Sequence, residues 1–191
     1  VFNTFQCYLR HAALDLSQPL EGSEREGWHF ACKLVRGAYM VLERDRAVEQ
    51  GYESPIHDTI EDTHACYNNA MRTVVGRSAV KEGRSKANIL VASHNQGSIE
   101  LALKLMGDAN ICRYTGGVYF GQLLGMADHL TFSLGSSGYQ AYKYLPYGPF
   151  YEVLPYLVRR AQENSSLLGN VAEERRMIKN ELMRRAISFM S

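Results

Sequence analysis

Short apolar runs alternate with amphipathic stretches along the chain, and this alternation predicts strands separated by helices. The apolar runs are rich in β-branched and aromatic residues and are bounded by glycine, proline or polar residues, which is typical of buried strands. They lie at residues 1–8, 30–36, 88–93, 117–120 and 140–145. Helical patterns are expected within 9–27 and over 43–50, 58–82, 96–106, 150–164 and 173–190.

The start of the long helix over 58–82 has a local signal. Asp58 is the expected N-cap, because a carboxylate at that position accepts hydrogen bonds from the first free N–H groups. Glu61 follows three residues later, the position at which a capping box has glutamate or glutamine. We therefore expect this helix to begin directly after Asp58.

Strands and helices alternate about every 30 residues, which is the spacing of parallel βαβ units with right-handed crossovers. Two α/β architectures accept this pattern: a doubly wound open sheet and part of a (β/α)8 barrel. A complete barrel typically needs about 250 residues and eight strands, so five strands do not close one. The chain enters a strand directly at Val1, which we interpret as processing or as the absence of an earlier part.

Composition excludes several classes of protein. Apolar residues make up 46% of the 191 residues and charged residues 21%, as in an ordinary globular domain. The formal net charge of +1 provides no basic field for nucleic acid. No apolar stretch approaches the roughly 20 residues of a membrane-spanning helix. The 4 cysteines form no CxxC pair and the histidines show no paired spacing, so no disulfide framework and no metal site is expected.

Candidate functional residues stand where the predicted strands end, because α/β proteins bind ligands at that edge. These positions combine donors, cations and aromatic rings without an acid, which indicates a site for an anionic or electron-rich ligand. Two alternatives stay open: Lys33 could lie at a strand edge with its amine in water, and Asn95 could cap the next helix. The positions are Gln6, Lys33, Arg36, Gly37, Tyr39, Ser93, His94, Asn95, Leu123, Gly125, Met126, Tyr144 and Tyr147.

The predicted helix over 150–164 carries a second candidate. Tyr156, Arg159, Arg160 and Glu163 recur at helical spacing and share one face. Two neighbouring guanidinium groups can bind one carboxylate through charge-assisted hydrogen bonds, and Glu163 could hold one of them in place. Charged residues at this spacing more often form a solvent-exposed helix face. The aromatic ring of Tyr156 on the same face argues against that interpretation.

Five segments in register carry a family resemblance, whereas GxGxxG, P-loop and GxSxG motifs are absent. They are KLVRGAY at 33–39, ASHN at 92–95, YFGQLLGM at 119–126, YKYLPYG at 142–148 and EVLPYLVRRAQENSS at 152–166. In this order, and over nearly the whole chain, they resemble the proline dehydrogenase family in its eukaryotic mitochondrial form. The resemblance implies that residues 1–191 are the C-terminal part of an FAD-binding (β/α)8 barrel domain whose N-terminal strands are missing.

The resemblance also implies an activity. The family oxidises L-proline to 1-pyrroline-5-carboxylate by passing a hydride to flavin N5, and a membrane quinone then reoxidises the flavin. It follows that the protein would be mitochondrial, peripherally associated with the matrix side of the inner membrane, and without a nucleic-acid partner. The cofactor, rather than the protein, carries the redox chemistry.

Residue roles follow by resemblance only. Arg159 and Arg160 match the clamp for the substrate carboxylate, and Tyr156, Leu123 and Tyr39 match the walls around the proline ring. Tyr144 matches a ring-packing tyrosine that favours proline over hydroxyproline, and it joins Lys33 as a catalytic residue. The positions that match the cofactor site are Gln6, Lys33, Arg36, Gly37, Ala38, Ser93, His94, Asn95 and Glu163, of which Glu163 also steadies the arginine pair.

The sequence leaves three alternatives open. A hydroxyproline dehydrogenase would share the same motifs. A non-catalytic fragment of such an enzyme would have the same sequence but bind no flavin. An unrelated aldolase-type barrel is disfavoured, because Lys33 is the only plausible Schiff-base lysine.

Overall fold

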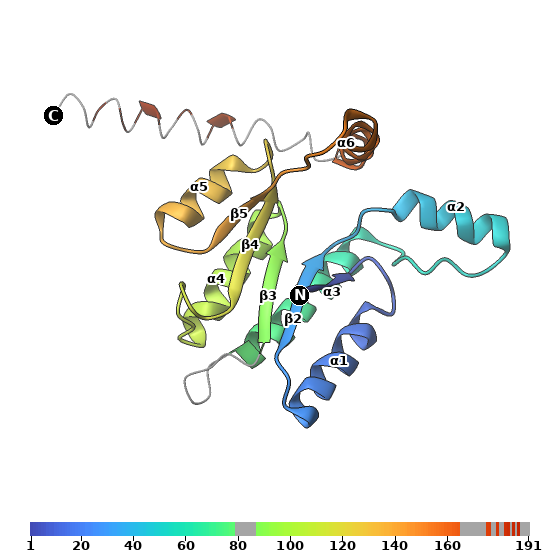
Figure 1. The fold of residues 1–191 in the computed structure, drawn as a ribbon, viewed down its shortest axis with the longest axis horizontal. Coiled ribbons are helices and arrows are strands. Elements are labelled where there is room, and N and C mark those ends of the chain that lie inside the picture. Colours follow the sequence, from blue (N-terminus) through green and yellow to red (C-terminus); the bar gives the residue numbers. More distant parts are fainter. Residues whose placement is uncertain are drawn as a thin grey trace.

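The computed structural model describes residues 1–78 and 87–164, excluding the side chains of 161–164, together with seven helical residues between 175 and 187. Strands and helices alternate along the chain, as the apolar pattern predicts (Figure 1). The strands are β1 (Asn3–Gln6), β2 (Phe30–Val35), β3 (Ala87–Ala92), β4 (Val118–Leu123) and β5 (Ala141–Tyr144). The helices are α1 (Ala12–Glu26), α2 (Met40–Gln50), α3 (Ile60–Ser78), α4 (Gln96–Asp108), α5 (Asp128–Ser136) and α6 (Phe150–Asn164).

The sheet has five parallel strands in the order β1-β2-β3-β4-β5. Each strand therefore pairs with the next one in the sequence, as in consecutive units of a barrel. A doubly wound sheet reverses its strand order at a switch point, and no such reversal occurs among the described strands. The topology selects the barrel-type architecture from the two that the sequence allows.

Alternate residues of each strand face opposite sides of the sheet. One set is buried in β2, β3 and β4 and forms the core with α3, where Tyr67, Met71 and Val74 belong to the same cluster. We call the opposite side the open face, because its residues are half-buried or exposed. The strand register places on it Thr4, Gln6, Ala31, Lys33, Val35, Asn88, Leu90, Ala92, Tyr119, Gly121, Leu123, Tyr142 and Tyr144.

The observed bounds differ from the predicted ones at several elements, and helix α2 begins at Met40, three residues before the predicted start. The first strand is shorter than the predicted run, and β4 extends three residues beyond residue 120, to Leu123. Helix α5 follows β4 and was not predicted, because its threonine, serine and glycine residues obscure the apolar pair Leu130 and Leu134, which are buried one turn apart. The predicted helix over 173–190 lies mostly outside the described residues.

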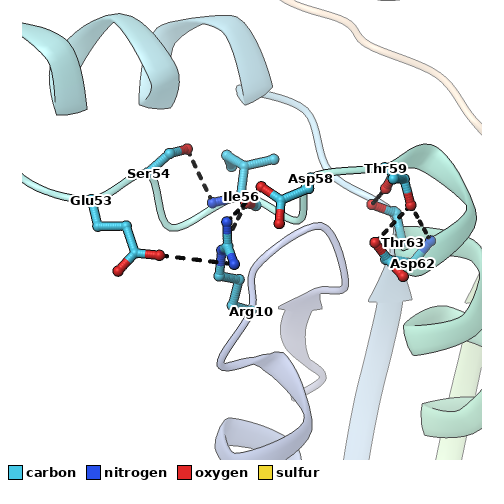
Figure 2. Close-up of polar contacts among 8 residues, drawn as sticks. All are labelled: Arg10, Glu53, Ser54, Ile56, Asp58, Thr59, Asp62 and Thr63. Carbon is cyan, nitrogen blue, oxygen red and sulfur yellow. Dashed lines mark hydrogen bonds and ion pairs between the residues drawn. The ribbon is translucent and has the colours of Figure 1, made fainter.

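The predicted N-cap at Asp58 was wrong. Thr59 caps α3 instead: its Oγ1 accepts the N–H of Asp62 at 3.1 Å and donates to the Asp62 carboxylate at 2.6 Å. Figure 2 shows that Asp58 is bound by Arg10, which reaches it at 2.7 Å and donates to the carbonyl of Ile56 at 3.0 Å. The same guanidinium lies 3.9 Å from Glu53. Asp58 therefore takes part in a long-range ion pair, and the cap lies one residue later, at Thr59.

No helix in the described ranges combines the length and the apolar character that crossing a bilayer requires.

Candidate functional site

Helix α6 lies beyond the end of the sheet toward which the strand arrows point (Figure 1). This position brings it against the last residue of β5, where the rings of Tyr144 and Tyr156 are 5.9 Å apart between centroids. The Nζ atom of Lys33, from β2, lies 5.7 Å from the centroid of the Tyr144 ring. Three of the predicted site residues, from three separate elements, therefore meet at Tyr144.

The guanidinium of Arg160 is held between aromatic rings on the same side. Its central carbon lies 5.3 Å from the ring centroid of Tyr156 and 5.4 Å from that of Tyr39. One of its nitrogens donates to the carbonyl of Ala38 at 3.3 Å. Burial, and then the neighbouring Tyr144, raises the pKa of Tyr156 to about 12, so its hydroxyl keeps its proton at neutral pH.

A hollow of about 200 Å³ opens between β4, β5 and α6. Apolar and aromatic side chains form most of its wall, and Arg160 supplies the one charge among the lining residues. Such a lining suits a small apolar ring that carries a carboxylate. The hollow is lined by Leu123, Leu124, Met126, Tyr144, Pro146, Tyr156, Leu157 and Arg160.

Four predicted substrate residues, Leu123, Tyr144, Tyr156 and Arg160, thus line one hollow, and Tyr39 contacts Arg160 behind it. Sequence reasoning did not assign Leu124, Pro146 or Leu157 to the substrate, although all three lie inside or beside the quoted motifs. Arg159 is exposed and is not among the lining residues. The side chain of Glu163 lies outside the described part of the chain, so its predicted role stays a prediction.

Arg36 is bound by protein groups at all three guanidinium nitrogens. It donates to Nδ1 of His64 at 2.9 Å and to the hydroxyls of Ser93 and Ser98, each at 2.8 Å. It also stacks on the ring of Tyr67 at 4.4 Å, and burial lowers the pKa of Arg36. This side chain joins the end of β2 to α3, β3 and α4, so a cofactor would be contacted chiefly by the backbone that follows it.

That backbone needs glycine at position 37. Gly37 has φ +152°, and a Cβ built there would lie 1.3 Å from Cδ1 of the buried Tyr8. The chain at 36–38 therefore packs flat against Tyr8 and presents the Ala38 carbonyl to Arg160. One short segment connects the predicted cofactor side with the substrate side.

Residues 93–95, which follow β3, accept hydrogen bonds from nearby backbone N–H groups. Ser93 Oγ accepts the N–H of Asn95 at 3.1 Å, and Asn95 caps α4 by accepting the N–H of Ser98 at 2.9 Å. His94 Nε2 accepts the N–H of Leu123 at 3.0 Å. Burial, followed by the charge of Lys143, lowers the pKa of His94, so the ring is neutral and its proton is on Nδ1. The capping alternative for Asn95 is confirmed, and it does not prevent ligand contact.

Comparison with known proteins gives consistent results. Residues 1–173 match the family model described as proline dehydrogenase. The chain is 48% identical over 185 residues to "Proline dehydrogenase 1, mitochondrial" of Homo sapiens, covering 97% of this chain and 30% of that protein. It is 42% identical over 185 residues to "Hydroxyproline dehydrogenase" of Xenopus laevis, covering 97% of this chain and 39% of that protein.

Solved structures agree. Proline utilization A from Bdellovibrio bacteriovorus, inactivated by N-propargylglycine, superposes with a TM-score of 0.76 at 26% identity. The likeness covers 84% of this chain and 16% of that one, and it confirms the barrel-type α/β fold. The chain spans 28–40% of the length of the curated relatives compared with it.

Proposed function

Because the chain belongs to the proline dehydrogenase family, we propose that the protein oxidises L-proline to 1-pyrroline-5-carboxylate with FAD as electron acceptor. The observation that carries the proposal is the hollow whose apolar wall ends at the guanidinium of Arg160. We further propose that residues 1–191 form the C-terminal part of one barrel domain in this enzyme.

Substrate orientation would come from two kinds of contact. The guanidinium of Arg160 would bind the proline carboxylate by charge-assisted hydrogen bonds, with exposed Arg159, one residue earlier, completing the clamp. The rings of Tyr144 and Tyr156 would pack against the pyrrolidine ring. With its carboxylate and its ring both bound, the substrate could not rotate freely. A bound substrate that is already oriented for reaction has a lower entropic barrier, so it reacts faster.

The residues of the open face fit a flavin. Gln6 and Lys33 project from it on adjacent strands and offer an amide and an ammonium group to an electron-rich ring. None of the open-face residues carries a carboxylate, so the face would not repel negative charge. When bound there, FAD would supply the two-electron acceptor for oxidation of the proline C–N bond. The chain would contribute the backbone of Gly37 and Ala38 and the 93–95 strand end as further contacts.

Names of the relatives support a mitochondrial location, which we propose for this protein as well. By resemblance to the family, we propose peripheral association with the matrix side of the inner membrane and a quinone as the final acceptor. Hydroxyproline is the second candidate substrate, because relatives that are 42% and 41% identical are named hydroxyproline dehydrogenase.

The test is the visible spectrum of the purified full-length protein, recorded before and after anaerobic addition of L-proline. We expect flavin absorbance that bleaches with proline. The double variant Arg159→Met/Arg160→Met should keep its flavin absorbance and lose affinity for proline. Because each lost charge-assisted contact costs about 1.5–3 kcal/mol, we expect the KM for proline to rise by roughly tenfold or more. Flavin that proline leaves oxidised would contradict the activity, and an unchanged KM would contradict the clamp.

A further inference from the structure

The chain between β4 and α5 supplies Leu123, Leu124 and Met126 to the hollow. In the segment 123–128, residues 124–127 have no regular secondary structure, yet the backbone of this segment is held from several sides. Leu124 donates to the carbonyl of Tyr144 at 3.1 Å, and Leu123 donates to His94 at 3.0 Å. Ala127 adopts a left-handed conformation with φ +51°, which L residues with side chains rarely adopt. Such a conformation persists only where the surroundings hold it.

Lys143 binds two backbone carbonyl groups of this segment. Its Nζ lies 2.7 Å from the carbonyl of Met126 and 3.3 Å from that of Leu123. The same ammonium group lies 2.6 Å from the carboxylate of Asp128, at the start of α5. Only 19% of the Lys143 side chain is exposed, so these three partners replace most of its water.

Lys143 does not itself face the hollow. It stands between Tyr142 and Tyr144 on β5, and neighbouring strand residues point to opposite sides of a sheet. Tyr144 lies on the hollow, so Lys143 points toward the helical layer and binds the segment from behind. Any influence of Lys143 on substrate must therefore pass through the residues that it holds.

We propose that Lys143 is a positioning residue that sets the width of the hollow, and with it the choice between small ring substrates. Without its ammonium group, two carbonyls and one carboxylate would lose the donor that they share. The strained turn at Ala127 would then relax, and Leu123 and Met126 would retract from the ring. This inference rests on the proposed function, because it assumes that the hollow binds the substrate ring.

The experiment compares three variants of the full-length enzyme: Lys143→Met, Lys143→Arg and, as a control, Lys104→Met on the exposed side of α4. Kinetic constants are measured with L-proline and 4-hydroxy-L-proline, together with flavin content. For Lys143→Met we expect the KM for proline to rise at least tenfold while kcat changes less than threefold. The preference for proline, as a ratio of kcat/KM values, should fall at least fivefold. Lys143→Arg should recover most of both effects, and Lys104→Met should match the wild type.

A flavin-loaded Lys143→Met enzyme with unchanged KM and unchanged preference would overturn the proposal. If Lys143→Met does not fold, Asp128→Asn keeps the lysine and weakens its ion pair, and should shift both quantities in the same direction by a smaller factor.

Amide hydrogen exchange gives a readout that does not depend on the substrate. In Lys143→Met, exchange at Leu124 should accelerate at least tenfold, and unchanged exchange would contradict the positioning role. If the wild type does not oxidise proline while exchange accelerates in the variant, the proposed function fails and the structural role of Lys143 stands.

Discussion

Arg36 and Arg160 carry the same guanidinium group in opposite settings. Arg36 donates to side-chain acceptors on α3, on α4 and on the residue that follows β3, so its role is to hold the strand ends in place. Arg160 lies between two aromatic rings and borders the hollow, where a substrate carboxylate would arrive. The chemistry of a single residue in this protein is thus decided by what surrounds it.

Tyr144 is the residue at which substrate preference should change. In Tyr144→Ser, the ring that packs on proline is replaced by a small hydroxyl, which leaves room for the hydroxyl of 4-hydroxyproline. Losing part of an aromatic wall costs about 1–2 kcal/mol, so the ratio of kcat/KM values for the two substrates should shift by roughly tenfold toward hydroxyproline. Steady-state kinetics on both substrates measures this ratio. Tyr142→Ser, which alters a tyrosine outside the hollow, is the control, and an equal shift there would refute the assignment.

Cys66 should react as a thiolate near neutral pH. A hydrogen bond from Cys7, with help from His57, lowers the pKa of Cys66 to about 6, while burial raises the pKa of Cys32 to about 12. Only the thiolate is nucleophilic, so the alkylation rate of Cys66 should rise through pH 6 and level off above pH 7. Peptide mass spectrometry after iodoacetamide treatment measures this profile. In Cys7→Ala the midpoint should move to higher pH, and a midpoint of 8 or above in the wild type would contradict the prediction.

At the scale of elements, turns and strand ends are held by partners from other elements. The turn after β2 packs on Tyr8, Arg10 binds Asp58 next to the Thr59 cap of α3, and the turn before α5 is held by Lys143. These contacts position the ends of the strands, where the site is formed. A small change at one strand end should therefore disturb the site more than the same change in a helix.

Gly37→Ala tests this expectation. The new methyl group would overlap the ring of Tyr8 and would also need a backbone conformation that favours glycine. Overpacking of this kind costs about 1–3 kcal/mol, and the backbone strain adds to it, so we expect at least about 2 kcal/mol loss in the free energy of unfolding. Urea unfolding of the full-length protein measures the loss. Gly51→Ala, at φ +68° with nothing near its Cβ, should cost about 1 kcal/mol, and equal losses would exclude the Tyr8 clash.

On the scale of the whole molecule, every second residue of each of the five strands lies on the open face, and the parallel register places these residues side by side. The helical layer covers the other face, where the core lies. Among the open-face residues, Lys33 carries the single charge. The electrostatic character of this face therefore depends on one side chain.

Reversing that charge should abolish flavin binding. Lys33→Glu would place a carboxylate on a face that otherwise holds none, and we expect flavin content to fall more than tenfold. Lys33→Gln, which removes the charge without reversing it, should lose less. The absorbance ratio of flavin to protein measures both. Lys104→Glu makes the same charge reversal on the surface of α4, and a similar loss of flavin there would point to net charge rather than to the open face.

Much of the secondary structure could be predicted from the sequence alone, because strands and helices depend on local hydrophobic periodicity. Strand runs, most helices and the stripe of Tyr156 and Arg160 on α6 follow from backbone repeats of two and 3.6 residues. Helix α5 was missed because polar and small residues dilute its apolar repeat. The substrate wall was also largely predicted, since Leu123, Tyr144, Tyr156 and Arg160 line the hollow together.

The partners of polar side chains were decided only by the tertiary structure. Arg160 reaches the carbonyl of Ala38 across 122 positions, and Arg10 reaches Asp58 across 48. No local repeat encodes such pairs, because packing of the whole chain determines which donors and acceptors meet. The sequence by itself thus determined most of the elements, the parallel direction of the strands and the kinds of side chain at the strand ends, whereas the order of the strands in the sheet came from the tertiary structure. The tertiary structure decided which of those side chains are bound by the scaffold and which remain for a ligand.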